Sequence, residues 1–599
     1  MICKRFRKQG KITALLISAT ILLGFTGCSS VKTTTDSTQA QIGEVSVIDN
    51  SKWNYNSDDN VYYQLGIVYC SSPADSNYEN LAVFVPGDYM TASSNGDGTY
   101  TCSINDSATI NGYTALTAPI VMPINTPGYS AQAALTSYTD VSDYTDAGFV
   151  YVHAGCRGRE EGAPAGVTDL KAAIRYLRYS DNGIPGDTES IFTFGMSGGG
   201  AQSAIVGSTG DSSLYEPYLQ QIGALSGYSD AVLGSMCWCP ITNLDTADEA
   251  YEWMLGTTRT DLSDEEQQIS DRLAEAYASY VNTAGIKDPN GNLLTLETSD
   301  NGIYQSGSYY EYIKTVIENS LNNFLADTSF PYDSSSSGMS GGGPAGGGGP
   351  DMGSMSDGEG PGSGESPDSA PGGSQNDVES ADNITRNDTS SSGLSLTGTY
   401  ETAQDYIDAL NANGTWVTYD VSTNTATITS VDAFVNALKS ASKNLGAFDQ
   451  LDAGQGENTL FGYGDGSGAH FDAVLSQILN DLGNSYVSDY QTDLAKTDSA
   501  GNTVDVRLNM YTPLYYLLES QGGYGTSNVA KYWRIRTGIN QGDCALTTEV
   551  NLALALENYS GVTDVDFETV WGMGHTQAER SGNSTDNFIA WVNECMNNK

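Results

Sequence analysis

The most informative segment of this chain of 599 residues is Ile191-Phe-Thr-Phe-Gly195-Met-Ser197-Gly-Gly199-Gly-Ala-Gln-Ser-Ala. Its first four residues are typical of a buried strand, and the small residues from Gly199 onward are typical of a helix start. A strand that turns directly into a helix through Gly-x-Ser-x-Gly pushes the serine hydroxyl out of the sheet, and only small residues fit two positions to either side. The pattern predicts Ser197 as a catalytic nucleophile. The alternative is a glycine-rich turn without chemistry.

Strand-like runs alternate with helical patterns before this stretch and resume near the C-terminus. The runs are Gln64–Cys70, Leu81–Pro86, Pro119–Ile124, Gly148–His153, Ile191–Gly195, Ala231–Cys237, Tyr532–Thr537 and Val565–Trp571. Such alternation favours an α/β fold with a mostly parallel sheet flanked by helices. One helix is expected to start at Thr168-Asp169 and to bury Leu170, Ala173, Ile174 and Leu177. A last helix is expected around Phe588–Glu594.

The order of these runs predicts the domain organisation. We expect an α/β core built from residues 56–255 and 521–599, with residues 256–520 inserted between two of its strands as a lid. Residues 333–396 of this insertion contain no aromatic residue and are dominated by Gly, Ser, Pro and Asp, a composition typical of disorder.

A serine nucleophile needs a base, an acid that orients the base, and donors for the oxyanion. We expect His575 to be the base, because it follows the last strand and precedes the last helix. Asp543 is the expected acid, since it follows the penultimate strand; the rival acids are Asp245 and Asp248. The backbone N–H of Gly198, with a second donor at Thr126 after an earlier strand, is expected to form the oxyanion hole.

Four motifs are shared with one known family. They are Cys239-Pro-Ile-Thr-Asn-Leu-Asp245 with Ala247-Asp-Glu-Ala-Tyr-Glu-Trp253, Ala447-Phe-Asp449 with Glu457-Asn458 and Phe461-Gly462, Trp533-Arg-Ile-Arg536, and Gly-x-Ser-x-Gly-Gly itself. With these motifs the chain resembles the bacterial tannases, α/β-hydrolases that cleave esters of gallic acid and carry a large inserted lid. The resemblance covers most of residues 60–599 outside 333–396.

The resemblance implies a small aromatic ester as substrate and no cofactor. No metal is expected, because the three histidines form no HExxH motif and Cys237-Trp-Cys239 has no second half. The resemblance also implies that Lys443, Glu457 and Asp543 hold the phenolic hydroxyls. One departure bears on the mechanism, because the family has two acids spaced Asp-x-Asp where this chain has Gln541 and Asp543. Either Asp543 orients His575 or the triad lacks its acid. We favour Asp543, since a glutamine cannot stabilise the imidazolium charge.

Two alternative functions remain open from the sequence. One is another serine hydrolase of the same fold, such as a general carboxylesterase, a feruloyl esterase or a peptidase. The other is a non-catalytic surface lipoprotein that binds a ligand.

The first residues predict the location of the protein. Residues 1–27 carry five basic residues and no acid, and the apolar run 12–25 is too short to span a membrane. Because the run ends at Thr26-Gly27-Cys28, it resembles a bacterial lipoprotein signal with Cys28 as the lipidated residue. We expect residues 28–55 to form a polar tether, and the protein to face outward from a membrane of the bacterial cell envelope.

Charge and cysteine content exclude other classes of protein. With 26 Lys and Arg against 73 Asp and Glu, the chain carries a formal charge of −47, which disfavours nucleic acid as a partner. The cysteines do not indicate a disulfide scaffold, although Cys70 and Cys102 are the most plausible pair. The oligomeric state is left open.

Overall fold

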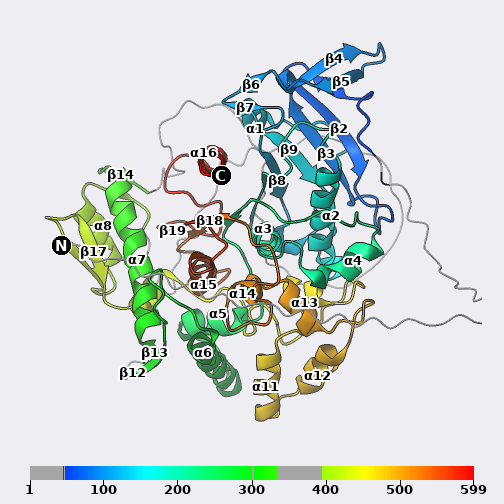
Figure 1. The fold of residues 1–599 in the computed structure, drawn as a ribbon. Coiled ribbons are helices and arrows are strands. Elements are labelled where there is room, and N and C mark those ends of the chain that lie inside the picture. The colour runs from blue at the N-terminus through cyan, green and yellow to red at the C-terminus, as the bar shows by residue number, and fades with distance from the viewer. Residues whose placement is uncertain (1–44, 46, 300–301, 335–393, 395) are drawn as a thin grey trace, which may run out of the picture. The chain divides into compact units, whose positions relative to one another are not determined.

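The computed structural model describes residues 45, 47–299, 302–334, 394 and 396–599 (Figure 1). The expected signal peptide at 1–27, the lipidation site Cys28 and most of the glycine-rich segment 333–396 therefore lie outside the described residues. No helix in the described part of the chain is long and apolar enough to cross a membrane.

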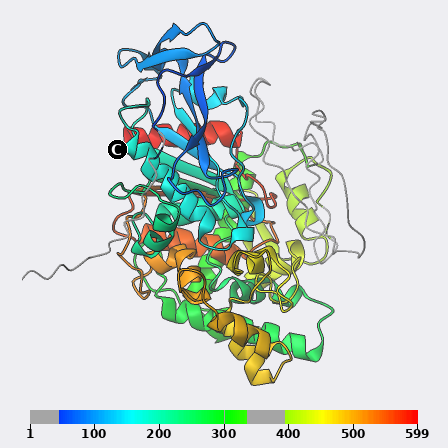
Figure 2. The ribbon, with the colours of Figure 1, turned by 90° about the vertical axis from the view of Figure 1, so that its right-hand side faces the viewer.

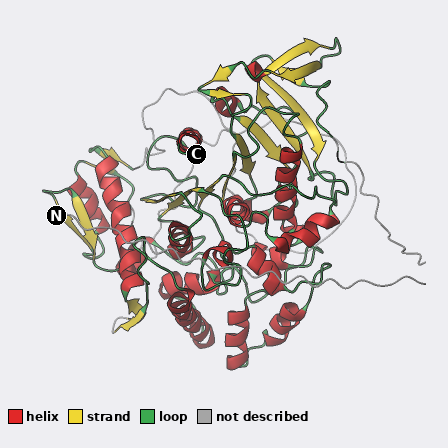
Figure 3. Ribbon diagram, viewed as in Figure 1, coloured by secondary structure: helices red, strands yellow, loops and turns green. Residues whose placement is uncertain are grey.

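A nine-stranded sheet forms the centre of the fold (Figure 3). Its strand order is β1-β2-β3-β9-β8-β10-β11-β18-β19. The first three pairings, from β1 to β9, are antiparallel, and the remaining five are parallel. The strands are β1 (Asn54–Asn56), β2 (Val61–Val68), β3 (Asn80–Pro86), β8 (Ile120–Ile124), β9 (Val150–Ala154), β10 (Ile191–Met196), β11 (Gly234–Trp238), β18 (Tyr532–Gly538) and β19 (Asp564–Val570). The mostly parallel sheet expected from the sequence is confirmed, with strand ends displaced by up to three residues.

Helices cover both faces of this sheet. On one face, α3 packs against β10 and β11, α15 packs against β18 and β19, and α2 packs against α3. On the other face, Phe588 and Trp591 of α16 form an aromatic cluster with Phe192 and Phe194 of β10. The core helices are α1 (Ser142–Asp146), α2 (Ala165–Tyr179), α3 (Gly198–Ser208), α4 (Glu216–Gln221), α15 (Leu546–Glu557) and α16 (Ser584–Asn597).

Helix α2 starts earlier than the sequence pattern indicates. The predicted buried positions Leu170, Ala173, Ile174 and Leu177 are all buried. However, the helix begins at Ala165, so the expected start at Thr168-Asp169 is wrong. Asp169 is not a cap; its buried carboxylate accepts hydrogen bonds from Nε (2.9 Å) and Nη2 (2.7 Å) of Arg157. An acid that forms a buried ion pair resembles a capping residue in the sequence.

The chain leaves the sheet after β11 and returns at β18, and these two strands are hydrogen-bonded neighbours. The intervening lid elements gather on one side of the sheet (Figure 2). They are α5 (Ala247–Leu255), α6 (Asp264–Ala284), β12 (Glu297–Ser299), β13 (Gly302–Ser306), α7 (Ser308–Asp327), β14 (Tyr332–Asp333), β15 (Thr399–Tyr400), α8 (Ala403–Leu410), β16 (Val417–Asp420), β17 (Thr425–Ile428), α9 (Val431–Leu438), α10 (Gly456–Phe461), α11 (Ala473–Leu482), α12 (Val487–Ala495), α13 (Val504–Met510) and α14 (Pro513–Leu517). Two small hairpins, β4–β5 (Met90–Ser94, Tyr100–Ile104) and β6–β7 (Thr109–Ile110, Tyr113–Thr114), lie outside the lid.

The seven cysteines of the described chain are all thiols. The expected Cys70–Cys102 disulfide is therefore wrong. Both residues are buried in the main hydrophobic cluster, and Cys70 Sγ lies 3.8 Å from Glu79 Oε1 as a weak donor. Both cysteines therefore act as small buried apolar side chains, and their presence in the core requires no disulfide.

Candidate active site

Ser197 stands at the turn between β10 and α3, as the sequence predicts. Its backbone has φ 59° and ψ −124°, a region that costs a non-glycine residue about 1–3 kcal/mol. The turn is fixed from two sides: the Ser197 N–H donates to the Trp238 carbonyl at 3.0 Å, and a Cβ on Gly199 would lie 2.1 Å from the Ile124 carbonyl oxygen. The glycine is thus required by the close approach of β8, and the strain at Ser197 is held by the surrounding strands.

Gly198, the first residue of α3, lies against the loop that follows β8. A Cβ at Gly198 would be 2.5 Å from both the Thr126 carbonyl oxygen and the Tyr129 nitrogen. The first N–H groups of a helix lack acceptors within the helix, so the Gly198 N–H is available for a ligand. Thr126 is fully buried, and its hydroxyl donates to Gln202 of α3 at 3.1 Å. The two expected oxyanion donors thus come from adjoining segments, and their role stays a prediction.

His575 lies in the segment 571–583 between β19 and α16, here called the histidine loop. Cys239, which follows β11, has its thiol 3.2 Å from the carbonyl oxygen of Thr576. Its neighbour Trp238 accepts the hydrogen bond from the Ser197 N–H. The end of β11 therefore contacts both the nucleophile turn and the histidine loop, and places Ser197 and His575 at the same edge of the sheet.

Gln541 lies closer to Nδ1 of His575 than the expected acid Asp543 does. Nδ1 of His575 lies 2.7 Å from Oε1 of Gln541, whose side chain is buried. Oδ2 of Asp543 lies 3.7 Å from the same nitrogen, and the Asp543 side chain is 39% exposed. The direct hydrogen bond that the sequence assigned to Asp543 is thus made by Gln541. Asp543 remains close enough to act through its charge, and its part in the triad stays a prediction.

The acid loop, residues 539–545 between β18 and α15, runs beside the histidine loop. The Asn540 N–H donates to the Met573 carbonyl at 2.9 Å. A Cβ on Gly538 would lie 2.0 Å from the Gly574 carbonyl oxygen, so only glycine allows this approach. The close packing of the two loops is what brings Gln541 to His575.

The rival acids Asp245 and Asp248 and the other two histidines of the chain, His153 and His470, lie in other surroundings. Asp248 accepts the backbone N–H groups of Phe448 (2.8 Å) and Asp449 (3.0 Å) in the lid. Asp245 is half-buried with its Oδ1 fully covered, and burial raises the pKa of its carboxyl to about 6. His470 pairs with Asp449 at 2.8 Å and stacks on Tyr490. His153 bonds to the Ala133 carbonyl at 2.9 Å.

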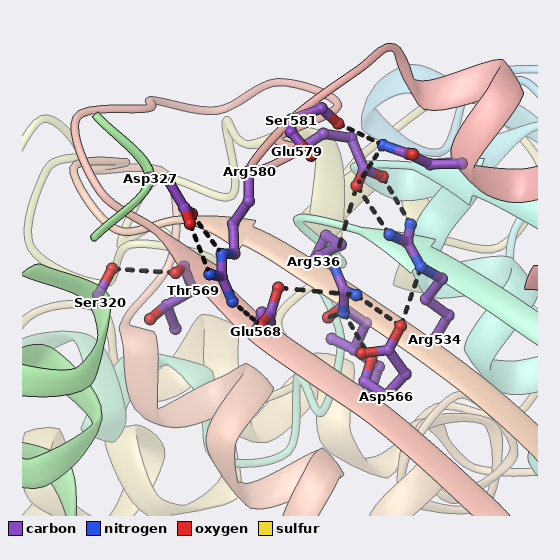
Figure 4. Close-up of polar contacts among 12 residues, drawn as sticks. Ser320, Asp327, Arg534, Arg536, Asp566, Glu568, Thr569, Glu579, Arg580 and Ser581 are labelled. Atoms are coloured by element: carbon purple, nitrogen blue, oxygen red, sulfur yellow. Dashed lines mark hydrogen bonds and ion pairs between the residues drawn. The ribbon is translucent and has the colours of Figure 1, made fainter. Parts of the chain in front are cut away.

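A network of ion pairs, buried at Glu579 and partly exposed at Arg580, anchors the far end of the histidine loop (Figure 4). Glu579 accepts from Nη1 (2.6 Å) and Nη2 (2.8 Å) of Arg534 in β18, and from the Trp238 indole at 2.9 Å. The next residue, Arg580, pairs with Asp327 at 2.9 Å and with Glu568 at 2.5 Å. Because the partners of Glu579 and Arg580 lie on core strands and on the lid helix α7, the loop that carries His575 is held in position.

The predicted substrate residues of the lid lie around the same edge. The Tyr251 hydroxyl donates to the Gly542 carbonyl (3.0 Å) and accepts the Lys443 N–H (3.1 Å), so the lid segment at Lys443 packs on the acid loop. Nζ of Lys443 lies 4.8 Å from the Phe448 ring centroid. Glu457 is buried in α10, a helix that contacts the 3₁₀ turn Pro127–Tyr129 after Thr126. Burial, and next the Glu457 charge, raise the pKa of Tyr129 well above its ordinary value.

Two buried charged residues escaped the sequence analysis. Lys439 donates from Nζ to the Gln541 carbonyl at 2.9 Å, and Glu549 of α15 accepts from the Gln541 amide at 2.6 Å. The available signal was Glu549 itself, an acid within the otherwise apolar or neutral helical residues 546–556. A buried acid in such a helix indicates a specific partner. In the described part of the chain, no group of three or more His, Cys, Asp or Glu side chains is arranged to hold a metal.

Comparison with known proteins agrees with this geometry. The BD-FAE family model, which describes esterases of the α/β-hydrolase fold, matches residues 113–283, a range that includes the nucleophile turn. Fusobacterium nucleatum tannase is similar in structure, with a TM-score of 0.63, 25% identity, and coverage of 90% of this chain and 95% of that one. Tannase from Lactobacillus plantarum gives a TM-score of 0.61, 24% identity, and coverage of 90% and 95%. A tannin acyl hydrolase in complex with ethyl gallate gives a TM-score of 0.60 and 24% identity, with coverage of 89% of this chain and 94% of that one. No curated protein sequence matches the chain.

The fold and the comparisons define the class of this protein as an α/β-hydrolase. Within that class it resembles the bacterial tannases over nearly its whole described length, as the sequence motifs predict. Both similarities support a carboxylic ester hydrolase.

Proposed function

We propose that this protein is a serine esterase that hydrolyses esters of phenolic acids through a covalent acyl-enzyme. The observation that carries the proposal is the strained turn at Ser197, held between β8, β11 and α3 with His575 at the same edge of the sheet. The substrate class rests on the structural likeness to the tannases, one of which is in complex with ethyl gallate.

In the proposed mechanism, Ser197 Oγ attacks the ester carbonyl while Nε2 of His575 takes its proton. The hydrogen on Nδ1 is donated to Gln541 Oε1, so that Nε2 carries no hydrogen and acts as the base. The negative oxygen of the tetrahedral intermediate accepts from the Gly198 and Thr126 N–H groups. His575 then protonates the leaving alcohol, and water releases the acid by the reverse route. Asp543, 3.7 Å away, stabilises the imidazolium by its charge.

Lys443, Glu457 and Asp543 are the proposed ligands of the phenolic hydroxyls. Lys443→Ala and Glu457→Ala should each lower kcat/KM for methyl gallate by about 10²-fold, because a substrate hydroxyl loses its buried partner. Hydrolysis of p-nitrophenyl butyrate, which has no such hydroxyls, should change little. Steady-state kinetics on both esters tests this.

Lys287→Ala and Glu311→Ala are matched controls, since both residues lie in the lid and on its surface, and neither variant should affect either ester. Equal losses on both esters in the Lys443 and Glu457 variants would show that these residues support the lid fold. Unchanged rates on both would contradict the phenolic specificity.

We also propose that Cys28 carries the lipid that anchors the protein outward on the bacterial cell envelope, with the residues that follow it as a tether. The tether is shorter than the expected 28–55, because Ile48 and Trp53 are buried in the core and β1 begins at Asn54. The support is the arrangement of basic residues, apolar run and cysteine in the sequence. Cys28→Ser should release the protein from membranes without changing its catalytic constants. Fractionation after a high-salt wash measures this, and a variant that still sediments with membranes would contradict the anchor.

A further inference from the structure

A buried carboxylate lies directly behind the glutamine that contacts His575. Glu549 is fully buried, and its Oε1 accepts hydrogen bonds from Gln541 Nε2 (2.6 Å), Thr537 Oγ1 (3.2 Å) and Cys544 Sγ (3.0 Å). Its other oxygen, Oε2, is buried and has no hydrogen-bond partner in the described part of the chain. The hydrogen bonds of this carboxylate therefore converge on the side that faces Gln541.

The charge of Glu549 decides which way the Gln541 amide points. An ionised carboxylate only accepts hydrogen bonds, so it requires the amide nitrogen of Gln541 on its own side and leaves Oε1 for His575. In the flipped amide, Nε2 would donate to Nδ1 of His575, and the ring proton would move to Nε2. A ring protonated at Nε2 cannot accept the proton of Ser197. Thr537 holds the second amide hydrogen at 2.6 Å, which completes the orientation.

We propose that Glu549 is the positioning acid of the active site and acts on His575 through Gln541. This inference rests on the proposed serine esterase function. In a triad whose acid contacts the histidine directly, that acid fixes the tautomer of the histidine and stabilises its positive charge. Here Gln541 makes the contact, and Glu549 adds a second negative charge, one residue further from the ring, to that of Asp543. The hydrogen bond to the carboxylate also polarises the amide, which makes Oε1 a stronger acceptor.

The surroundings of Glu549 make this arrangement sensitive to pH. Burial, opposed by the nearby Lys439 and the donated hydrogen bonds, raises the pKa of Glu549 to about 7. Burial also lowers the pKa of Lys439 to about 8. The other titratable groups that face the cluster are the thiols of Cys544 and Cys239, whose pKa values are raised by burial, and His575 and Asp543 across Gln541.

The sign of the pH dependence follows. Below about pH 7, Glu549 gains a proton and no longer fixes the amide, so activity should fall as the pH decreases. Since His575 must also be unprotonated, two protons block the free enzyme. The acid limb of log kcat/KM against pH should approach a slope of two, measured on methyl gallate.

The test compares two variants. One replaces Glu549 with the isosteric but uncharged glutamine, and the other exchanges the side chains of positions 541 and 549. Glu549→Gln should lower both kcat and the labelling rate of Ser197 by a fluorophosphonate by about 10²-fold, with KM little changed. For Glu549→Gln, the acid limb of log kcat/KM against pH should have a slope of one. In the exchange Gln541→Glu with Glu549→Gln, the carboxylate contacts His575 directly and accepts a hydrogen bond from the amide introduced on α15. This double variant should recover labelling to within about threefold of the wild type, because the acid acts without an intermediary.

A matched control is Glu249→Gln, another buried acid with a raised pKa, which lies in α5 and should keep the wild-type rate. A Glu549→Gln variant that is labelled at the wild-type rate overturns the inference. If Glu549→Gln does not fold, a folded double variant that remains slow also overturns it. Failure of the proposed function itself is a different result, namely no labelling of Ser197 in the wild type.

Discussion

Ser197→Ala should abolish hydrolysis of every ester that the wild type accepts, with kcat reduced by about 10⁶-fold. The hydroxyl is the only group that forms the covalent bond, and no other residue at the turn can replace it. The fold should be unaffected, because the side chain is partly exposed and its position is set by backbone contacts to Trp238 and by the Gly199 approach to β8. Alanine also removes no packing from the core.

The measurement is kcat on methyl gallate together with the melting temperature. Ser76→Ala, an exposed serine in the loop before β3, is the matched control and should behave as wild type. A Ser197→Ala enzyme that keeps substantial turnover, after the preparation is shown free of wild type, would rule out the acyl-enzyme mechanism.

His575→Ala should lower kcat nearly as much as Ser197→Ala does. Without the imidazole no group takes the Ser197 proton, and removal of either member of such a pair costs about 10⁶-fold in kcat. The double variant with Ser197→Ala should be no slower than either single variant, because the two residues act as one unit.

His470→Gln is a useful comparison, since His470 is the buried histidine paired with Asp449 in the lid. Loss of that pair should lower the melting temperature, whereas the activity of the folded enzyme should be less affected. If His575→Ala retained the wild-type rate, another base would have to be present, and the assignment built on the loop after β19 would be wrong.

The sequence predicts those parts of the molecule that depend on local patterns. The Gly-x-Ser-x-Gly turn is read from neighbouring residues, and the strands around it appear as apolar runs. Both are found within a few residues of their expected places. The position of His575 follows from the order of elements in the fold rather than from any contact. The resemblance to the tannases also rests on short motifs, and the structural comparison bears it out.

The sequence does not predict which side chain reaches His575. Gln541 and Asp543 are two residues apart in one loop, and their distances to Nδ1, 2.7 and 3.7 Å, follow from how that loop packs on the histidine loop. Chemical preference for an acid favours Asp543, whereas packing places Gln541 nearer. Glu549 was missed because its role depends on α15 facing the back of Gln541, which no spacing in the sequence reveals. The start of α2 was also misplaced because of a tertiary contact: Asp169 forms a buried ion pair with Arg157 and does not cap the helix.

Selection of phenolic hydroxyls by this enzyme is tested most directly with two esters of the same alcohol. The wild-type kcat/KM is measured for methyl gallate and for methyl 3,4,5-trimethoxybenzoate, which differ only in the masking of the three hydroxyls. We expect a preference for gallate of at least about 10²-fold, because the lid would lose its hydrogen bonds to the masked substrate. Equal rates, or a preference for the methylated ester, would contradict a phenolic esterase.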